Sequence, residues 1–483
     1  MKKIIISRLW LYRYRFVLGY ILLGLAFAAT VIFLPFLTPA GLSTAEMESA
    51  TTSFNTHFAS LADGNIVDLP YHILQKLSIL LFGLSIYSVK LPSIFIGLLL
   101  GLLLILLLNR WFKSNVALFA SIITVFSAPF LFLTGSGAPL IMLVFWPTFL
   151  LWLGSKIQGN KHPSSFYALS FAFALLLSLF TPHLIYLAIF IILFAIFNPH
   201  LRFTVKKLSK IALFTTIIII VAGFTTFTLL CIKQPTLITS MLLADNFSIN
   251  TFLDNLRLAF APFFAWGGGV ESTFPSPLIG LGSFALAFVG LLSTTKGFFA
   301  SRNAIASCFI IFSIVLAGLR PEAAILLILP FAILIAHGLR YILEKWYNLF
   351  PENPYARIFA ILPISLLLGI IIISDMSHFI FGYRYTPNVA DQFNNDITLI
   401  HENVNPDDIL VVNSDTEYNF YRILNETANF HVVDTIPVTH SNNFATLGEF
   451  SNANNSGKLY RIITSPKSDN SARIYLYTSN QEE

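Results

Sequence analysis

Long apolar segments alternate with short polar ones along most of the chain. A helix needs about 20 apolar residues to cross the hydrocarbon core of a bilayer, and eleven runs come close to or exceed this length. The runs are residues 16–37, 88–108, 115–133, 139–154, 165–180, 183–198, 210–232, 277–293, 303–319, 321–341 and 357–374. We therefore predict an all-α polytopic membrane protein with about eleven transmembrane helices. The first run exceeds a signal-peptide core and indicates an uncleaved helix.

The connections between these runs carry their positive charges in alternation. If the first helix runs outward, the basic side chains fall in every inner connection, and the outer connections are nearly free of them. The inner basic residues are Arg110, Lys113, Lys156, Lys161, Arg202, Lys206, Lys207, Lys210, Lys296, Arg302, Arg340, Lys345 and Arg357. The positive-inside rule then places the N-terminus in the cytoplasm of a plasma (inner) membrane protein. It also explains the net charge of +5 without a nucleic-acid partner.

Three outer segments are too long to be turns. We predict a multi-span domain over residues 1–374, with outer loops at 38–88 and 233–276, and an extracytoplasmic soluble α/β domain over 375–483. Within the first loop, Tyr71–Leu84 mixes apolar residues with polar ones, which is typical of a helix lying on the membrane surface.

The last segment of the chain differs sharply in composition from the rest. It is rich in Asn, Asp, Ser and Thr, and it contains short strand-like runs and one probable helix. The expected strands are Ile409–Asn413, His431–Ile436, Leu459–Thr464 and Arg473–Thr478, and the expected helix is Glu417–Leu424.

Composition supports the membrane assignment. Only 11% of the residues are charged, and the mean hydropathy is +0.75. In a soluble domain, roughly a quarter of all residues are charged. Cys231 and Cys308 both lie in apolar runs and are expected to be buried thiols. The scarcity of charged residues within the runs, and the absence of strong internal repeats, disfavour a transporter or flippase.

A set of Gly, Pro and Leu positions after the first run resembles the GT-C glycosyltransferases. The nearest branch is that of the protein O-mannosyltransferases and aminoarabinose transferases. The segments that carry the resemblance are Leu69-Pro70-Tyr71-His72, Leu81-Phe82-Gly83-Leu84-Ser85, Val89-Lys90-Leu91-Pro92-Ser93, Gly97, Ser127-Ala128-Pro129, Gly135, Arg320-Pro321-Glu322, Leu329-Pro330 and Ala336-His337-Gly338-Leu339.

This resemblance implies a GT-C-like fold and a specific reaction. Such enzymes pass a sugar from a polyprenyl-phosphate lipid to an acceptor glycan, lipid or protein on the outer membrane face. We therefore expect an inverting hexosyl or pentosyl transferase whose partners are that lipid and the acceptor. The alternative is a non-catalytic relative that binds lipid-linked glycans or a cell-envelope partner.

The family places a catalytic Asp-Glu pair in the first outer loop. Here Ala45 stands at the usual Asp position and Glu46 keeps the Glu. We expect Glu46 or Glu48 to supply the catalytic carboxylate, with Asp63 and Asp68 as weaker candidates. Alternatively, both glutamates are ordinary loop charges or the acidic first turn of a helix. A second family acid is missing, since Ala138-Pro139-Leu140 occupies its position.

The leaving phosphate requires cations or hydrogen-bond donors. Lys90, Arg320 and His72 are the candidates, and Arg320 is notable as the cation of a very short outer turn. The alternative for Lys90 is a side chain that extends to the lipid interface. The alternative for His72 and its neighbour Tyr71 is an anchor for the surface helix.

The second outer loop offers a candidate acceptor site or lid. The loop contains Gly267-Gly268-Gly269, with Trp266 directly before them and Glu271 shortly after them. Arg257 lies further upstream in the same loop. A Trp beside three glycines could stack on a sugar ring, although a flexible turn explains the same pattern. We expect no bound metal and no cofactor, because the acidic pairs with which some family members hold a divalent cation are depleted here.

Overall fold

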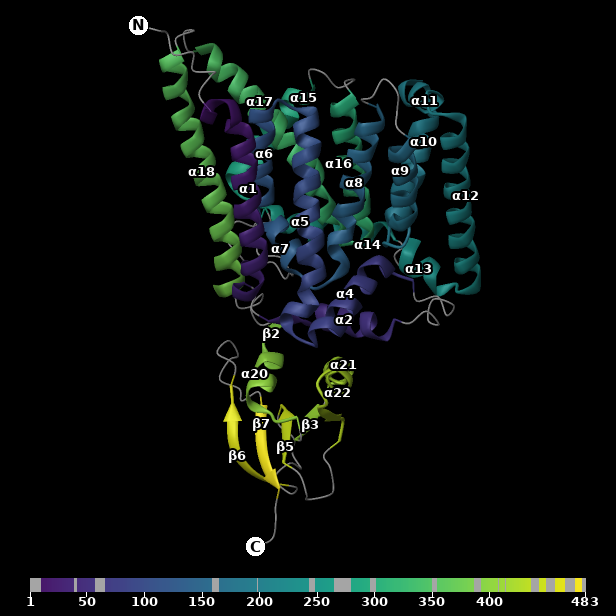
Figure 1. The fold of residues 1–483 in the computed structure, drawn as a ribbon, viewed down its shortest axis with the longest axis vertical. Coiled ribbons are helices and arrows are strands. Elements are labelled where there is room, and N and C mark those ends of the chain that lie inside the picture. The colour runs from purple at the N-terminus through teal and green to yellow at the C-terminus, as the bar shows by residue number, and fades with distance from the viewer. Residues whose placement is uncertain are drawn as a thin grey trace. The chain divides into compact units, whose positions relative to one another are not determined.

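The computed structural model divides the protein into two compact units (Figure 1). Unit 1 comprises Met1–Ile32, Ile96–Thr134 and Leu140–Phe379, and unit 2 comprises Phe33–Phe95, Gly135–Pro139 and Ile380–Glu483. The residues that the structure describes are 10–38, 41–56, 66–158, 165–197, 199–242, 248–264, 279–295, 301–349, 354–385, 392–406, 408–412, 414–435, 443–448, 457–464 and 474–479.

Unit 1 is built of helices, and several of them, including α1, α5 and α18, continue into unit 2. The longer helices run side by side in a bundle (Figure 1). In chain order the helices are α1 (Trp10–Leu37), α5 (Ile86–Trp111), α6 (Ser114–Val125), α7 (Ala128–Gly135), η2 (Pro139–Ile141), α8 (Met142–Gln158), α9 (Ser165–Ser178), α10 (Leu184–Phe197), α11 (Pro199–Lys206), α12 (Lys210–Lys233), α13 (Thr236–Leu242), α14 (Ile249–Phe264), α15 (Leu281–Thr295), α16 (Ser301–Leu319), η3 (Pro321–Leu327), α17 (Ile328–Leu349) and α18 (Pro354–Tyr385).

These helices make the protein a multi-pass membrane protein. Among the described residues, six helical segments are long and apolar enough to cross a bilayer. The bent pair of α6 and α7, which meet at 60°, could form a seventh span. Helices α9, α10, α15 and α16 are apolar but shorter. Each of the apolar runs named from the sequence therefore overlaps one or two helices, although fewer of these helices pass the length test for a span.

Close packing of α15 on α17 depends on two glycines. A Cβ atom at Gly290 would collide with the backbone carbonyl of Leu334, and one at Gly338 would collide with that of Leu286. The two backbones approach each other more closely than side chains would allow, which is how small residues bring helices together in membranes.

Unit 2 contains the first outer loop and the C-terminal part of the chain. The loop forms two helices, α2 (Thr44–Asn55) and α4 (Leu69–Phe82). It also supplies strand β1 (Leu42–Ser43), which pairs antiparallel with β2 (Phe393–Asn394). Helix α4 confirms the helix expected at Tyr71–Leu84, and its position at a membrane surface stays a prediction.

The C-terminal part is a small α/β fold, as the sequence indicated. Its sheet has the order β4-β3-β5-β7-β6, in which β3 runs parallel to β4 and β5, and β7 runs antiparallel to β5 and β6. The strands are β3 (Ile409–Val412), β4 (His431–Val433), β5 (Phe444–Leu447), β6 (Gly457–Ile463) and β7 (Ile474–Ser479), and the helices are α20 (Asp396–Asn403), α21 (Asp415–Tyr421) and α22 (Ile423–Thr427).

One apolar core joins the two parts of unit 2. Met47 and Leu84 from the first outer loop belong to the same buried cluster as Ile400 and Phe420 from the C-terminal fold. A ring nitrogen of His401 also forms a hydrogen bond of 3.0 Å with the carbonyl oxygen of Leu84. The C-terminal fold is therefore packed on the first outer loop.

The domain boundary expected at residue 375 lies within a helix. Helix α18 continues to Tyr385, so Asp375 is a buried helical residue whose carboxylate accepts a hydrogen bond of 2.6 Å from the hydroxyl of Ser283. The sequence misled here because the polar residues from Asp375 onward resemble a loop, whereas a polar partner on α15 makes an acid tolerable in that position.

Candidate functional site

A capping box starts the helix that carries the candidate carboxylates. Ser43 is the N-cap of α2, and its hydroxyl accepts a hydrogen bond of 3.3 Å from the N–H of Glu46. In return, Glu46 Oε2 accepts one of 2.8 Å from the N–H of Ser43. This reciprocal arrangement fixes where the helix begins.

The other carboxylate oxygen of Glu46 is equally occupied. Glu46 is only 1% exposed, and its Oε1 accepts a hydrogen bond of 2.5 Å from the N–H of Gly137. The same oxygen lies 4.0 Å from Nζ of Lys90, which is also 1% exposed. Lys90 in turn lies 5.8 Å from the ring centroid of Phe393. Glu46 and Lys90 therefore form a buried ion pair inside unit 2.

Gln75 links the surrounding elements through four hydrogen bonds. Its Nε2 donates to the carbonyl oxygens of Val89, at 3.0 Å, and Gly137, at 2.8 Å. Its Oε1 accepts from the hydroxyls of Ser49, at 2.9 Å, and Ser53, at 2.6 Å. This fully paired amide joins α2, α4, α5 and the connection before α8, and sequence reasoning did not identify it.

His72 belongs to the same network. Its Nδ1 lies 2.6 Å from the hydroxyl of Ser53. Because Gln75 Oε1 can only accept, the Ser53 proton is given to it, and Nδ1 of His72 must carry the proton of the second bond. Burial lowers the pKa of His72 to about 4, so the ring is neutral near pH 7 and Nε2 has no proton to offer. The network thus favours the anchoring role of His72 over phosphate binding.

The exposed face of α2 presents a different carboxylate. Ala45 and Glu48 are both exposed, whereas Glu46 is buried. Residues three apart in a helix are neighbours on one face, so Glu48 lies beside the position at which the GT-C resemblance expects an Asp. The two candidate acids therefore differ in burial, because Glu48 is exposed to solvent and Glu46 is buried.

Arg320 lies in unit 1, between α16 and η3. Its side chain is exposed, and its charge acts on His183 in the connection between α9 and α10. Burial, and secondarily Arg320, lower the pKa of His183 to about 4. His183 is 2% exposed and has a backbone φ of 66°. Neither ring nitrogen has a hydrogen-bond partner within the described part of the chain. The lone His after a proline gave only a weak sequence signal.

The remaining candidates lie apart from these groups or outside the described residues. Arg257 is exposed on α14. Asp68 precedes α4 and is 8% exposed. Trp266, Glu271 and Asp63 fall outside the described residues, so their assigned roles stay predictions. Within the described ranges, no group of three His, Cys, Asp or Glu residues could hold a metal ion.

The fold resembles that of solved membrane glycosyltransferases. ArnT from Cupriavidus metallidurans in the apo state matches with a TM-score of 0.53 and 14% identity, over 95% of this chain and 98% of that one. The structure of the same protein bound to undecaprenyl phosphate matches equally well, over 96% and 98%. The apo oligosaccharyltransferase of Archaeoglobus fulgidus matches with a TM-score of 0.53 and 12% identity, over 88% of this chain and 65% of that one.

A family comparison agrees with this fold. Residues 70–227 match the model described as dolichyl-phosphate-mannose-protein mannosyltransferase. The matched region begins at α4 and ends within α12, and it includes the motif segments Leu81–Ser85, Val89–Ser93 and Ser127–Pro129. A search of curated proteins found no match. The predicted resemblance to GT-C glycosyltransferases of the protein O-mannosyltransferase and aminoarabinose-transferase branch is thus confirmed.

Proposed function

We propose that this protein transfers a glycosyl group from a polyprenyl-phosphate sugar to an acceptor on the extracytoplasmic face of the membrane. The GT-C fold and the match to a mannosyltransferase family support the reaction class. The similar ArnT structure that holds undecaprenyl phosphate supports the class of donor. The positive-inside pattern supports an N-terminus in the cytoplasm and a C-terminal fold outside.

The observation that carries the proposal is the pair of unequal acids on α2. Glu46 is fixed by Ser43, Gly137 and Lys90, and it holds the start of the helix in place. Glu48 projects from the opposite, exposed side. A rigid support beneath an open carboxylate is what general-base catalysis requires, since the base must reach the proton that it removes.

The reaction is a single displacement at the anomeric carbon. Glu48 takes the proton of the acceptor's nucleophilic group, which forms a bond to that carbon. The bond between the anomeric carbon and the phosphate oxygen breaks, and the lipid phosphate leaves with the electron pair. Attack from the side opposite the leaving group inverts the configuration. Arg320 is an exposed cation at the end of α16 in unit 1, and its role as a phosphate contact stays a prediction.

Lys90 has a supporting role in this proposal. Its buried side chain neutralises Glu46 and packs near Phe393. A buried lysine paired with a carboxylate cannot also serve an exposed phosphate without breaking that pair. We therefore assign Lys90 to the positioning of α2 rather than to the phosphate.

The test is a transfer assay with the purified full-length protein in proteoliposomes. Undecaprenyl-phosphate mannose, glucose and arabinose serve as donors, a membrane extract supplies acceptors, and released undecaprenyl phosphate is measured by mass spectrometry. Glu48→Gln should lower the rate by about 10²–10⁴-fold without changing thermal unfolding. Glu344→Gln, at an exposed acid of α17, is the control. Full activity of Glu48→Gln would remove the catalytic assignment.

A non-catalytic lipid-binding relative is the second candidate, because Ala45 replaces the acid that the family places there. Native mass spectrometry with undecaprenyl phosphate separates the two. Tight binding without release of the carrier lipid, for any donor or acceptor fraction, would favour the binding protein.

A further inference from the structure

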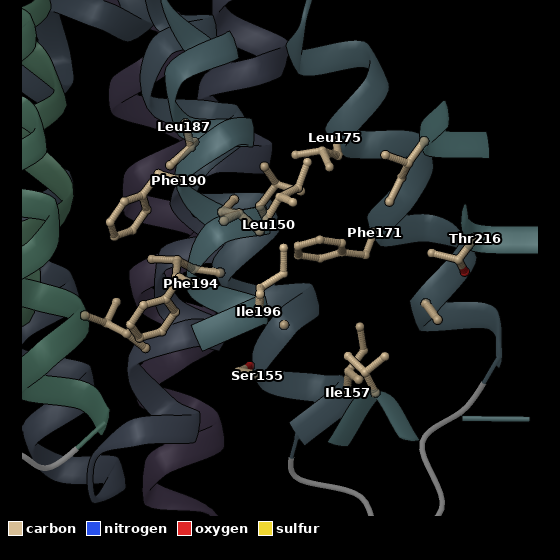
Figure 2. Close-up of a pocket in the computed structure, with 18 of the residues that line it drawn as sticks. Leu150, Ser155, Ile157, Phe171, Leu175, Leu187, Phe190, Phe194, Ile196 and Thr216 are labelled. Carbon is tan, nitrogen blue, oxygen red and sulfur yellow. The ribbon is translucent and has the colours of Figure 1, made fainter. Parts of the chain in front are cut away.

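Unit 1 encloses a large apolar cavity that the proposed reaction does not use. Its volume is about 710 Å³, and α8, α9, α10, α11, α12 and α16 contribute to its wall. Figure 2 shows Leu150, Phe171 and Phe190 around it, each from a different helix. Side chains of this kind make poor hosts for water, because a buried water needs two or more polar partners.

One end of the cavity is basic. Arg202 and Lys206 of α11 line it there, and both side chains are exposed. A third cation, Arg110, donates a hydrogen bond of 3.1 Å from Nε to the carbonyl oxygen of Ser155, which also lines the cavity. This end adjoins the connections that the positive-inside pattern assigns to the cytoplasm.

Within the described part of the chain, these cations have no acidic partner. The sequence contains no Asp or Glu between Asp68 and Asp245, a stretch that includes α5 to α13. Helices α15 and α16 contain none either. Among the described residues, neither Arg202 nor Lys206 has an ion pair. An anion bound beside them would therefore meet no competing carboxylate among the described residues.

We propose that this cavity binds one anionic phospholipid from the membrane leaflet at its basic end. The acyl chains occupy the space among α8, α9, α10 and α12, and the phosphate lies against Arg202 and Lys206. Charge complementarity selects the headgroup, since basic side chains at the surface of a bilayer attract anionic lipids. The apolar wall selects the chains, since burying them removes apolar surface from water.

The cavity is separate from the proposed site of the donor phosphate. Ala304 lines it near the start of α16, whereas Arg320 follows the end of that helix. Sixteen residues at 1.5 Å each place these two positions about 24 Å apart. A lipid whose headgroup lies beside Arg202 therefore does not occupy the place of the donor, and this inference does not depend on the proposed reaction.

The experiment measures lipid binding to the delipidated full-length protein by native mass spectrometry. Dioleoyl phosphatidylglycerol and dioleoyl phosphatidylcholine are titrated separately, and undecaprenyl phosphate is titrated as a third probe. The protein should bind phosphatidylglycerol at least about tenfold more tightly than phosphatidylcholine. In the double variant Arg202→Gln/Lys206→Gln, the affinity for phosphatidylglycerol should fall by about tenfold, so that the preference over phosphatidylcholine disappears. The control Lys113→Gln/Lys345→Gln, with the same charge change outside the cavity, should retain it within about twofold.

A second variant tests the cavity itself. A Cβ at Gly154 would meet only an edge of Phe171, at 3.9 Å, so Gly154→Leu should fit and fill part of the space. This substitution should weaken the binding of both phospholipids while leaving the midpoint of thermal unfolding in detergent unchanged. The proposal fails if the two phospholipids bind equally to the parent protein, or if the control pair weakens binding as much as Arg202→Gln/Lys206→Gln. The proposal also fails if Arg202→Gln/Lys206→Gln weakens the binding of undecaprenyl phosphate as much as that of phosphatidylglycerol. The cavity would then be a site for the donor lipid.

Discussion

The carboxylate of Glu46 accepts a hydrogen bond of 2.5 Å from the backbone N–H of Gly137, which lies 91 residues further along the chain. This bond ties the first outer loop to the connection before α8. Gln75 reinforces it, because its Nε2 donates to the carbonyl oxygen of the same glycine. The position of α2 therefore depends on buried polar contacts as well as on its apolar side.

The first prediction concerns the charge of Glu46. Glu46→Gln keeps the size of the side chain but removes the carboxylate from the buried pair with Lys90. Removing one partner of a buried pair costs about 3–5 kcal/mol, so the midpoint of thermal unfolding should fall markedly. The measurement is thermal unfolding of the purified protein in detergent, followed by tryptophan fluorescence.

Two controls qualify this result. The exposed pair of Arg340 and Glu344, with side chains 45% and 52% exposed, is screened by water, so Glu344→Gln should change stability by about 1 kcal/mol or less. Adding Lys90→Met to Glu46→Gln removes the other charge of the pair and should restore part of the loss. Equal melting of Glu46→Gln and the parent would show that the ion pair contributes nothing.

The second prediction follows from the pKa of His72. Burial lowers it to about 4 from the ordinary value of 6.5, so the folded protein binds fewer protons than the unfolded chain between these values. The contribution of His72 to the free energy of unfolding is therefore fully present above pH 6.5, and it is lost as the pH falls towards 4. One group with this shift contributes up to about 3 kcal/mol. His72→Asn should flatten the acid side of a stability–pH curve measured with denaturant.

His183 has a pKa lowered to a similar value, so His72→Asn alone should remove only part of the pH dependence. His183→Asn should remove a further part. An acid branch unchanged in both single variants would mean that other groups control acid unfolding.

Much of the fold could be predicted from the sequence, because a membrane imposes a strong constraint on it. Every backbone group inside lipid must be paired within a helix, so each long apolar run had one available structure. The motif from Leu69 to Gly97 indicated the fold family, because the joint spacing of its Gly, Pro and Leu positions is uncommon. Strand β5 escaped prediction, because its four residues are all buried and so show no alternation of apolar and polar positions.

The candidate site was harder to predict. The sequence showed two glutamates two residues apart, but only the helix shows that one is buried and the other is exposed. Gln75 gave no signal, because an amide becomes informative only when its four partners are assembled from distant segments. His183 was missed for the same reason, since its burial and the proximity of Arg320 arise from tertiary structure.

The third prediction tests the contact between α15 and α17. Gly338→Ala places a methyl group against the carbonyl oxygen of Leu286, and Gly290→Ala places one against that of Leu334. Forcing the helices apart should cost about 1–3 kcal/mol for each substitution. The matched control is Gly369→Ala in α18, where a Cβ would meet nothing within 4 Å. Thermal unfolding should separate the three variants, and a loss in Gly369→Ala as large as in the others would refute the packing argument.

The last prediction restores an acid at position 45. Ala45 and Glu48 share the exposed face of α2, so an aspartate at 45 can approach the same region of the site as the Glu48 carboxylate. It would also lie in the first turn of the helix, where negative charge is favourable. In the Glu48→Gln background, Ala45→Asp should therefore raise the rate of carrier-lipid release by about tenfold or more without loss of stability. Ala45→Asn is the matched control, because it has nearly the same shape but cannot accept a proton from the acceptor. Equal rates for the Asp and Asn variants would show that this face of α2 does not supply the base.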